Sequence, residues 1–174
     1  MKYLITLPWM PYPATDGGKQ GSFNMLMELQ NMIDITLIYP VFFKKQMACQ
    51  YLLEKQLPKV KVYPFEYYKN KDGIKSQYSL FRLHRIITRK FLKQPYLATP
   101  IYKDAYIDFV NEIIKKERID IVQNEYFEQL YMVYAIPNTV KKVFIQHEIQ
   151  YIAKERLIQQ REYPSSVRYL ATMQ

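Results

Sequence analysis

Cysteine, histidine and glycine are scarce in this sequence. Its 174 residues include one cysteine, Cys49, two histidines and four glycines. A single cysteine excludes an internal disulfide framework and is typical of a reducing compartment. No stretch approaches the roughly 18 uncharged apolar residues that a membrane span needs. Pro8 also interrupts the first apolar run, Tyr3–Leu7, too early for a signal peptide. We therefore expect a soluble, cytoplasmic protein.

Apolar residues, in contrast, are abundant. Hydrophobic residues make up 49% of the chain and charged residues 24%, which is typical of a folded domain with a packed core. A chain of this length has room for one domain of ordinary size. We therefore expect residues 1–174 to form a single domain.

Positive charge is concentrated in the middle of the chain. The net charge is +9, and residues 41–100 hold thirteen basic and three acidic residues, a net of +10. Such a patch attracts phosphate groups on nucleic acid, on anionic lipid or on a small molecule. Alternatively, it is a solvated face that keeps the protein soluble. Since neither an aromatic RNA-binding strand nor a helical DNA reader is recognisable, we expect no nucleic-acid partner.

Short β-branched runs alternate with longer helical stretches along the chain. The expected strands are Tyr3–Leu7, Asp34–Tyr39, Lys59–Tyr63, Ile119–Gln123 and Lys142–Gln146. The expected helices are Lys19–Asn31, Lys44–Leu57, Gln77–Lys93, Ile101–Arg118 and Ile149–Arg161. We expect Pro40 to close the second strand and Pro64 the third. Strands joined by helical crossovers predict a doubly wound parallel sheet with helices on both faces, an α/β fold of the Rossmann-like type.

In such a sheet, ligands bind in the crevice at the carboxyl ends of the strands. The loops that lead out of those ends are therefore the first places to look for a site. They are residues 8–18 after the first strand, 124–128 after the fourth, and 147–148 after the fifth.

Three of the four glycines, Gly17, Gly18 and Gly21, lie at the start of the first expected helix. Missing Cβ atoms let a ligand approach the backbone, and the free N–H groups of a helix N-terminus favour an anion such as a phosphate. Alternatively, the glycines serve a tight turn and close packing of the helix on the sheet at Gly21. Neither known phosphate loop fits, because no Walker sequence is present and Asp16 holds the first glycine position of a dinucleotide fingerprint.

His147 directly follows the fifth expected strand. At that position it can donate to a sugar hydroxyl or transfer a proton, or it can be a structural histidine at a strand end. Tyr151 replaces the second histidine of a zinc-protease motif, and no other metal-ligand spacing is present. We therefore expect no metal.

Three groups of residues resemble retaining glycosyltransferases of the family-4 type. They are Pro11–Pro13 with Asp16–Gly18 and Asn24–Leu26, then Ile119–Val122 with Glu125, and finally Gln146–Tyr151. Such enzymes pair two Rossmann-like domains across a cleft in the GT-B fold. By this resemblance, the chain is the N-terminal, acceptor-side domain, and the C-terminal nucleotide-sugar domain is absent from it. Alone, it should then be inactive or nearly so.

The resemblance also implies roles for individual residues. His147 would be the catalytic residue beside the transferred sugar. The residues expected to contact the donor diphosphate or the substrate are Gly17, Gly18, Tyr12, Glu125 and Glu148. Transfer would retain the anomeric configuration, with a nucleotide sugar as co-substrate and no cofactor or metal. The acceptor would be a glycan or a lipid-linked glycan, and the leaving phosphate would be stabilised electrostatically. The alternative function is a non-catalytic binding module for a phosphorylated or anionic ligand.

A basic stripe marks the third expected helix. Its members are Arg82, Arg85, Arg89 and Lys93, spaced so that they share one helix face. Basic amphipathic helices can lie on anionic bilayers, and relatives in the resembling family dock to membranes through this domain. We therefore expect peripheral association with a membrane that carries the acceptor. The alternative is a packed helix with a solvated basic face.

Overall fold

The computed structural model describes residues 1–70, 103–126 and 129–147. The helices expected over 77–93 and 149–161 therefore lie outside the described residues. The same holds for five candidate site residues, which are Arg82, Arg85, Arg89, Lys93 and Glu148.

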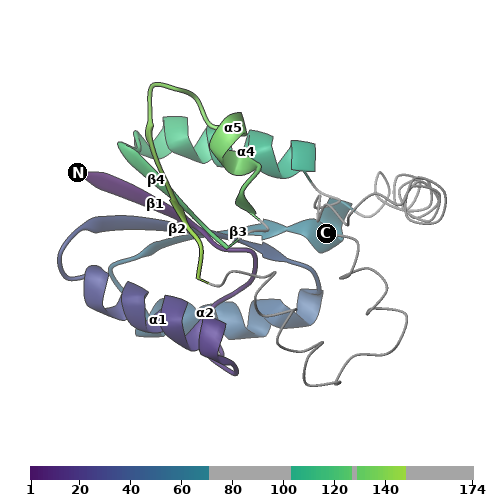
Figure 1. Cartoon of the computed structure of the whole chain (residues 1–174). Helices are drawn as coiled ribbons and strands as arrows, with labels where there is room; N and C mark the ends of the chain where they lie inside the picture. Colours follow the sequence, from purple (N-terminus) through teal and green to yellow (C-terminus); the bar gives the residue numbers. More distant parts are fainter. Residues whose placement is uncertain (71–102, 127–128, 148–174) are drawn as a thin grey trace, which may run out of the picture.

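The described residues form one sheet of five parallel strands in the order β3-β2-β1-β4-β5 (Figure 1). The strands are β1 (Lys2–Thr6), β2 (Asp34–Val41), β3 (Lys61–Glu66), β4 (Ile121–Glu125) and β5 (Lys141–Ile145). The α-helices are α1 (Gly17–Leu29), α2 (Met47–Gln56), α4 (Lys103–Glu117) and α5 (Met132–Ala135), and the 3₁₀ turns are η1 (Lys44–Gln46) and η2 (Tyr67–Asn70). In Figure 1, α4 and α5 cover one face of the sheet while α1 and α2 cover the other. The doubly wound α/β fold of the Rossmann-like type is thus confirmed.

Strand β1 lies at the centre of the sheet. From it the chain runs outward through β2 to β3, then returns and runs outward on the other side through β4 to β5. Ile5 consequently has Leu37 of β2 on one side and Gln123 of β4 on the other. The order therefore reverses between β1 and β4, and such a switch point is where parallel sheets bind ligands.

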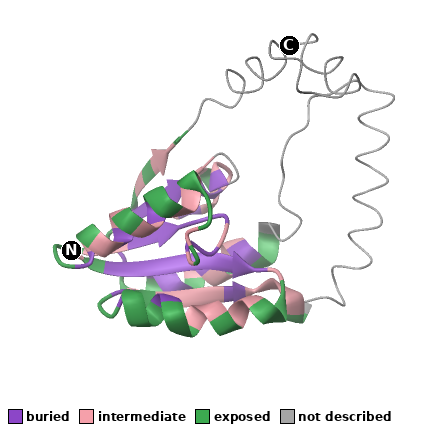
Figure 2. Cartoon of the chain, turned by 90° about the horizontal axis from the view of Figure 1, so that it is seen from below, coloured by how far each residue is buried: buried purple, intermediate pink, exposed green. Residues whose placement is uncertain are grey.

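Each face of the sheet carries its own core, because successive side chains of a strand point to opposite faces. Leu4 belongs to the cluster under α4, whereas Ile5 belongs to the cluster over α1 and α2. Both residues are fully buried. Figure 2 shows this burial along the central strands, with exposed residues on the outer sides of the helices. The apolar first strand is thus explained by burial on both faces.

The expectation that Pro40 and Pro64 end their strands is wrong. β2 continues to Val41 and β3 to Glu66, and Pro40 is paired with Phe65. Pairing of β2 with β1 has already ended at Ile38, so the missing N–H of Pro40 removes no bond from that pairing. Pro64 lies in β3, the outermost described strand on its side, where proline is tolerated.

Two helix starts also differ from the expectation. α1 begins at Gly17, two residues early, because Asp16 caps it: its Oδ1 accepts from Lys19 N at 2.9 Å. The second helix opens with the 3₁₀ turn η1 before α2 starts at Met47. The short helix α5 was not expected from the sequence.

Glu117 ties the end of α4 to β3. Lys61 Nζ donates to its Oε2 at 2.8 Å and Tyr63 OH donates to its Oε1 at 2.7 Å. The hydrogen bond from Lys61, followed by that from Tyr63, lowers the pKa of Glu117. A lowered pKa in the folded state stabilises the fold above the unfolded carboxyl's pKa of about 4.3, and this stabilisation is lost as the pH falls through the folded-state value.

We expect Glu117→Gln to lower the free energy of unfolding at pH 7 by at most about 1 kcal/mol, because Lys61 is half exposed and solvent screens the pair. The difference from wild type should shrink as the pH falls below about 4. Urea unfolding over a pH series measures both effects. Glu112→Gln, at an exposed position of the same helix, is the matched control and should show neither. A deficit that is independent of pH would contradict the ion pair as its cause.

Candidate functional site

A carboxylate and an imidazole meet at the carboxyl end of the sheet. Glu125 is the last residue of β4, and His147 lies two residues beyond the end of β5. Strand pairing sets Glu125 beside Ile145, which brings the two side chains together. His147 Nε2 lies 3.0 Å from Glu125 Oε2; the glutamate side chain is fully buried and the histidine side chain is 35% exposed. One member of the pair is thus inside the protein and the other reaches the surface.

The buried carboxylate has two further partners. Gln123 Nε2, from the same strand, lies 2.6 Å from Oε1, and Ser22 Oγ, from α1, lies 3.2 Å from Oε2. Ser22 is itself fully buried. All three neighbours of the carboxylate can donate, and an ionised carboxylate only accepts, so its hydrogen bonds are satisfied.

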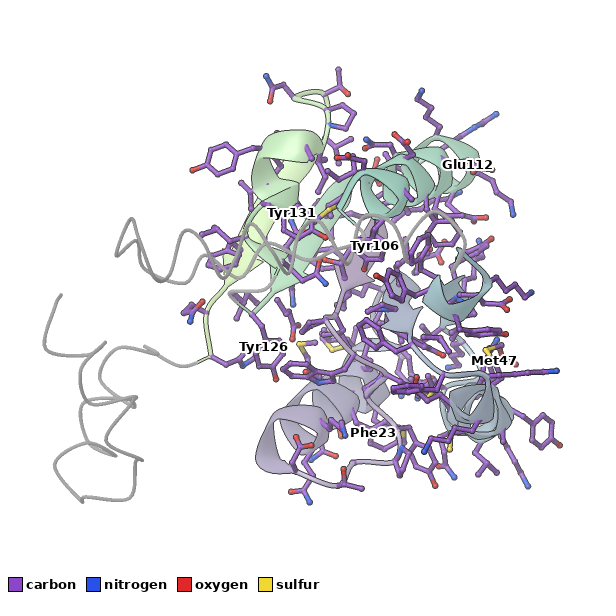
Figure 3. The ribbon with its side chains drawn as sticks, turned by 90° about the vertical axis from the view of Figure 1, so that its right-hand side faces the viewer. Phe23, Met47, Tyr106, Glu112, Tyr126 and Tyr131 are labelled. Atoms are coloured by element: carbon purple, nitrogen blue, oxygen red, sulfur yellow. The ribbon has the colours of Figure 1, made fainter. Side chains whose placement is uncertain are left out.

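Tyr126 joins the surrounding loops. Its ring stacks on the imidazole of His147, with centroids 4.3 Å apart and planes 25° apart, and contacts the ring of Trp9 at 4.6 Å. Its hydroxyl donates to Gly18 O at 2.9 Å. In Figure 3, Tyr126 lies between the end of the strands and α1. A single side chain thus contacts the loops after β1 and β5 and the first turn of α1.

The backbone of Tyr126 is strained. Its φ is +67°, in the left-handed region that bulky residues rarely adopt. Such a conformation costs about 1–3 kcal/mol and persists where surrounding contacts fix it, often at functional sites. Here the N–H of Tyr126 donates to Ile145 O at 3.0 Å, and the ring contacts hold the side chain. This left-handed backbone conformation therefore sets the direction in which the Tyr126 side chain points after the end of β4.

The first turn of α1 lies next to this cluster. Asp16 caps it and also pairs with Lys19 Nζ at 3.2 Å. The hydrogen bond from the backbone N–H of Lys19 lowers the pKa of Asp16. A ligand anion at this helix end would therefore meet the N–H groups of Gly17 and Gly18 beside a carboxylate.

The glycines of this turn differ in their surroundings. A Cβ at Gly18 would come within 3.2 Å of Tyr126 OH, whereas a Cβ at Gly17 or Gly21 would meet nothing within 4 Å. None of the three has a positive φ. The alternative interpretation of Gly21, close packing of the helix on the sheet, is therefore wrong. Of the three glycines, Gly18 alone has a neighbour closer than an ordinary van der Waals contact at the position of a Cβ.

We expect Gly21→Ala to raise the free energy of unfolding by about 0.5–1 kcal/mol, since alanine is the better helix former and its methyl group finds open space here. Chemical denaturation measures the gain. Gly18→Ala is the matched comparison, and it should gain less because its methyl group would press on Tyr126 OH. Equal gains at both positions would contradict the close approach at Gly18.

The structure brings together some of the sequence-predicted residues and not others. Gly18 and His147 both contact Tyr126, and Glu125 contacts His147. The half-buried ring of Tyr12 instead packs against Phe23 of α1, with centroids 5.5 Å apart. Glu148 and the basic stripe are outside the described residues.

Sequence reasoning missed four residues of the cluster. They are Ser22, Gln123, Tyr126 and also Tyr3 of β1, whose hydroxyl donates to Gln123 Oε1 at 2.6 Å. One signal was available, because Gln123, Asn124 and Glu125 are three consecutive polar residues at the end of a buried strand, and all three are buried. Buried polar groups need partners. The sequence gives no sign that the partners come from α1 and β1.

Fold and site together define a Rossmann-like α/β protein in which a buried carboxylate pairs with a part-exposed imidazole at the carboxyl edge of the sheet. The sequence matches none of the protein-family models against which it was scanned, and a search of curated proteins gave no significant match either. In the described part of the chain, no helix is long and apolar enough to cross a membrane. Nor do the described residues gather three metal-ligating His, Cys, Asp or Glu side chains in one place.

Proposed function

We propose that this chain is the acceptor-side half of a retaining glycosyltransferase of the GT-B type. It would take part in moving a sugar from a nucleotide-sugar donor to a glycan or to a lipid-linked acceptor at an anionic membrane. The observation that carries the proposal is the His147–Glu125 pair, 3.0 Å apart at the carboxyl end of the sheet and joined through Tyr126 to the first turn of α1. The motif resemblance supplies the reaction class.

The contacts of the site support a division of roles. The imidazole of His147 reaches the surface and is backed by a buried carboxylate, so it can exchange a proton or a hydrogen bond with a sugar hydroxyl. The N–H groups of Gly17 and Gly18 lie at a helix N-terminus, where a diphosphate is stabilised by the helix dipole. Because these groups are fixed before the reaction, they would stabilise the leaving phosphate electrostatically, without a metal.

A transfer assay tests the proposal. The complete transferase, which would comprise this chain and the donor-side half, would be incubated with radiolabelled nucleotide sugars and, as acceptors, soluble glycans or anionic vesicles that carry lipid-linked glycans. We expect label to move to an acceptor and the product to keep the anomeric configuration of the donor. Binding of a nucleotide sugar or another phosphorylated ligand without transfer would favour the non-catalytic binding module. If neither binding nor transfer is seen, both functions are wrong.

A further inference from the structure

A chain of hydrogen bonds runs from β1 to His147. Tyr3 OH donates to Gln123 Oε1 at 2.6 Å, and Gln123 Nε2 donates to Glu125 Oε1 at 2.6 Å. Glu125 Oε2 then meets His147 Nε2 at 3.0 Å. The two middle members are buried, with Gln123 4% exposed and Glu125 fully buried. Tyr3 and Gln123 are 120 residues apart and Glu125 and His147 are 22 apart, so this series of hydrogen bonds exists only in the folded sheet.

In this series of hydrogen bonds, donor and acceptor can be assigned at each step. Burial, followed by the negative charge of Glu125, raises the pKa of Tyr3, so its hydroxyl keeps its proton and donates. The amide oxygen of Gln123 therefore faces Tyr3 and its NH₂ group faces Glu125. A second contact agrees with this orientation, since Gln123 Nε2 also lies 3.7 Å from Met25 Sδ, a weak acceptor.

We propose that Tyr3 and Gln123 are positioning residues that hold Glu125 as an acceptor, so that His147 carries its proton on Nε2 and presents Nδ1 to a ligand. Neutral imidazole has one donor and one acceptor nitrogen, and the partner of one nitrogen decides the state of the other. A carboxylate can only accept, which assigns the proton to Nε2. The stacked ring of Tyr126 holds the plane of the imidazole.

Only one part of this inference rests on the proposed function, namely the identity of the ligand group at Nδ1. That group would be a hydroxyl of the sugar or acceptor. The bare Nδ1 accepts a proton or a hydrogen bond from such a hydroxyl. Ser22 Oγ lies 3.2 Å from the same carboxylate oxygen as His147 and also 3.2 Å from Tyr126 OH, so its single proton can be donated to either oxygen.

Nitrogen-15 NMR of the imidazole rings tests the assignment without any substrate. The chain has only two histidines, so His84→Ala assigns both sets of signals. In the wild type, at a pH high enough for the imidazole to be neutral, we expect His147 to carry its proton on Nε2 and none on Nδ1. The reverse tautomer would overturn the proposal, whatever any variant does.

Glu125→Gln should move that proton. The new amide must turn its oxygen to the NH₂ group of Gln123, so its own NH₂ group faces His147 Nε2, which then has to accept. We expect the major form of His147 to shift from Nε2–H to Nδ1–H, with the backbone amide spectrum showing an intact fold. An unchanged tautomer in a folded Glu125→Gln protein would overturn the proposal.

A second substitution tests the part played by Tyr3. Adding Tyr3→Phe to Glu125→Gln frees the Gln123 amide to turn over, so part of the Nε2–H form should return. Adding Tyr12→Phe instead removes the hydroxyl of another half-buried tyrosine and should restore none of it. If both additions restore Nε2–H equally, or if neither does, Tyr3 is not a positioning residue. A tautomer shift without sugar transfer would count against the proposed function alone, and transfer with an unchanged tautomer would count against this inference alone.

Discussion

His147→Ala is expected to lower the turnover of the proposed sugar transfer by about 100- to 10,000-fold, the range found when a positioned acid or base is removed. The reason is geometric. Alanine removes the part-exposed imidazole that contacts the buried Glu125 carboxylate directly. The substitution also removes the ring that stacks on Tyr126. Initial rates of the complete transferase, with this chain and the donor-side half, at saturating donor and acceptor measure the loss.

The controls for His147→Ala separate chemistry from folding. Lys141→Ala changes an exposed residue at the other end of β5 and should leave the rate unchanged. His84→Ala removes the other histidine and should also be active. Since a structural role would lower stability rather than turnover, unfolding curves of each variant belong beside the rates. Wild-type kinetics for His147→Ala would make this residue structural and remove the catalytic proposal.

Tyr106→Ala is expected to lower the free energy of unfolding by about 3–5 kcal/mol, the range for deleting a large buried aromatic ring. Tyr106 is fully buried in the cluster under α4, and its ring meets that of Phe65 edge to face with centroids 5.3 Å apart. A domain of this size is stable by only about 5–15 kcal/mol, so the loss removes a large share of its stability. Urea unfolding at constant temperature gives the difference.

Tyr134→Ala is the matched control for this experiment. Tyr134 lies in α5 on the same face of the sheet, and its exposure is 85% (Figure 1). Removing an exposed ring should change the stability by no more than about 0.5 kcal/mol. Similar losses for the two tyrosines would mean that Tyr106 does not support the core that holds α4 on the sheet.

The fold could be predicted from the sequence because a strand that is buried on both faces is a continuous run of apolar residues. Strand β2 is buried at every position from Ile35 to Val41, and the helices between strands demand parallel pairing. The ends of β2 and β3 were harder to predict. Pro40 and Pro64 are compatible with a strand or with its end, and the extent of the neighbouring strand decides between the two.

The position of the candidate site could be predicted in part. Glu125 and His147 follow neighbouring strands, and parallel strands end at the same edge, so the sequence was enough to predict them near each other. It did not predict that Glu125 is buried or that Tyr126 separates His147 from Gly18. The direction of the Tyr126 side chain depends on its left-handed backbone, which no pattern in the sequence signals.

The sequence by itself determined the class of fold, the loops at the carboxyl edge of the sheet and the residues at the carboxyl ends of the strands, because these follow from hydrophobic periodicity and from the direction of parallel strands. Only the tertiary structure decided the partners of the buried carboxylate. Ser22 and Glu125 are 103 residues apart, and Tyr3 and Gln123 are 120 apart. Such pairs are set by the register of β1 against β4 and by the packing of α1 on the sheet. Neither of these can be predicted from hydrophobic periodicity, because each depends on contacts between distant parts of the sequence.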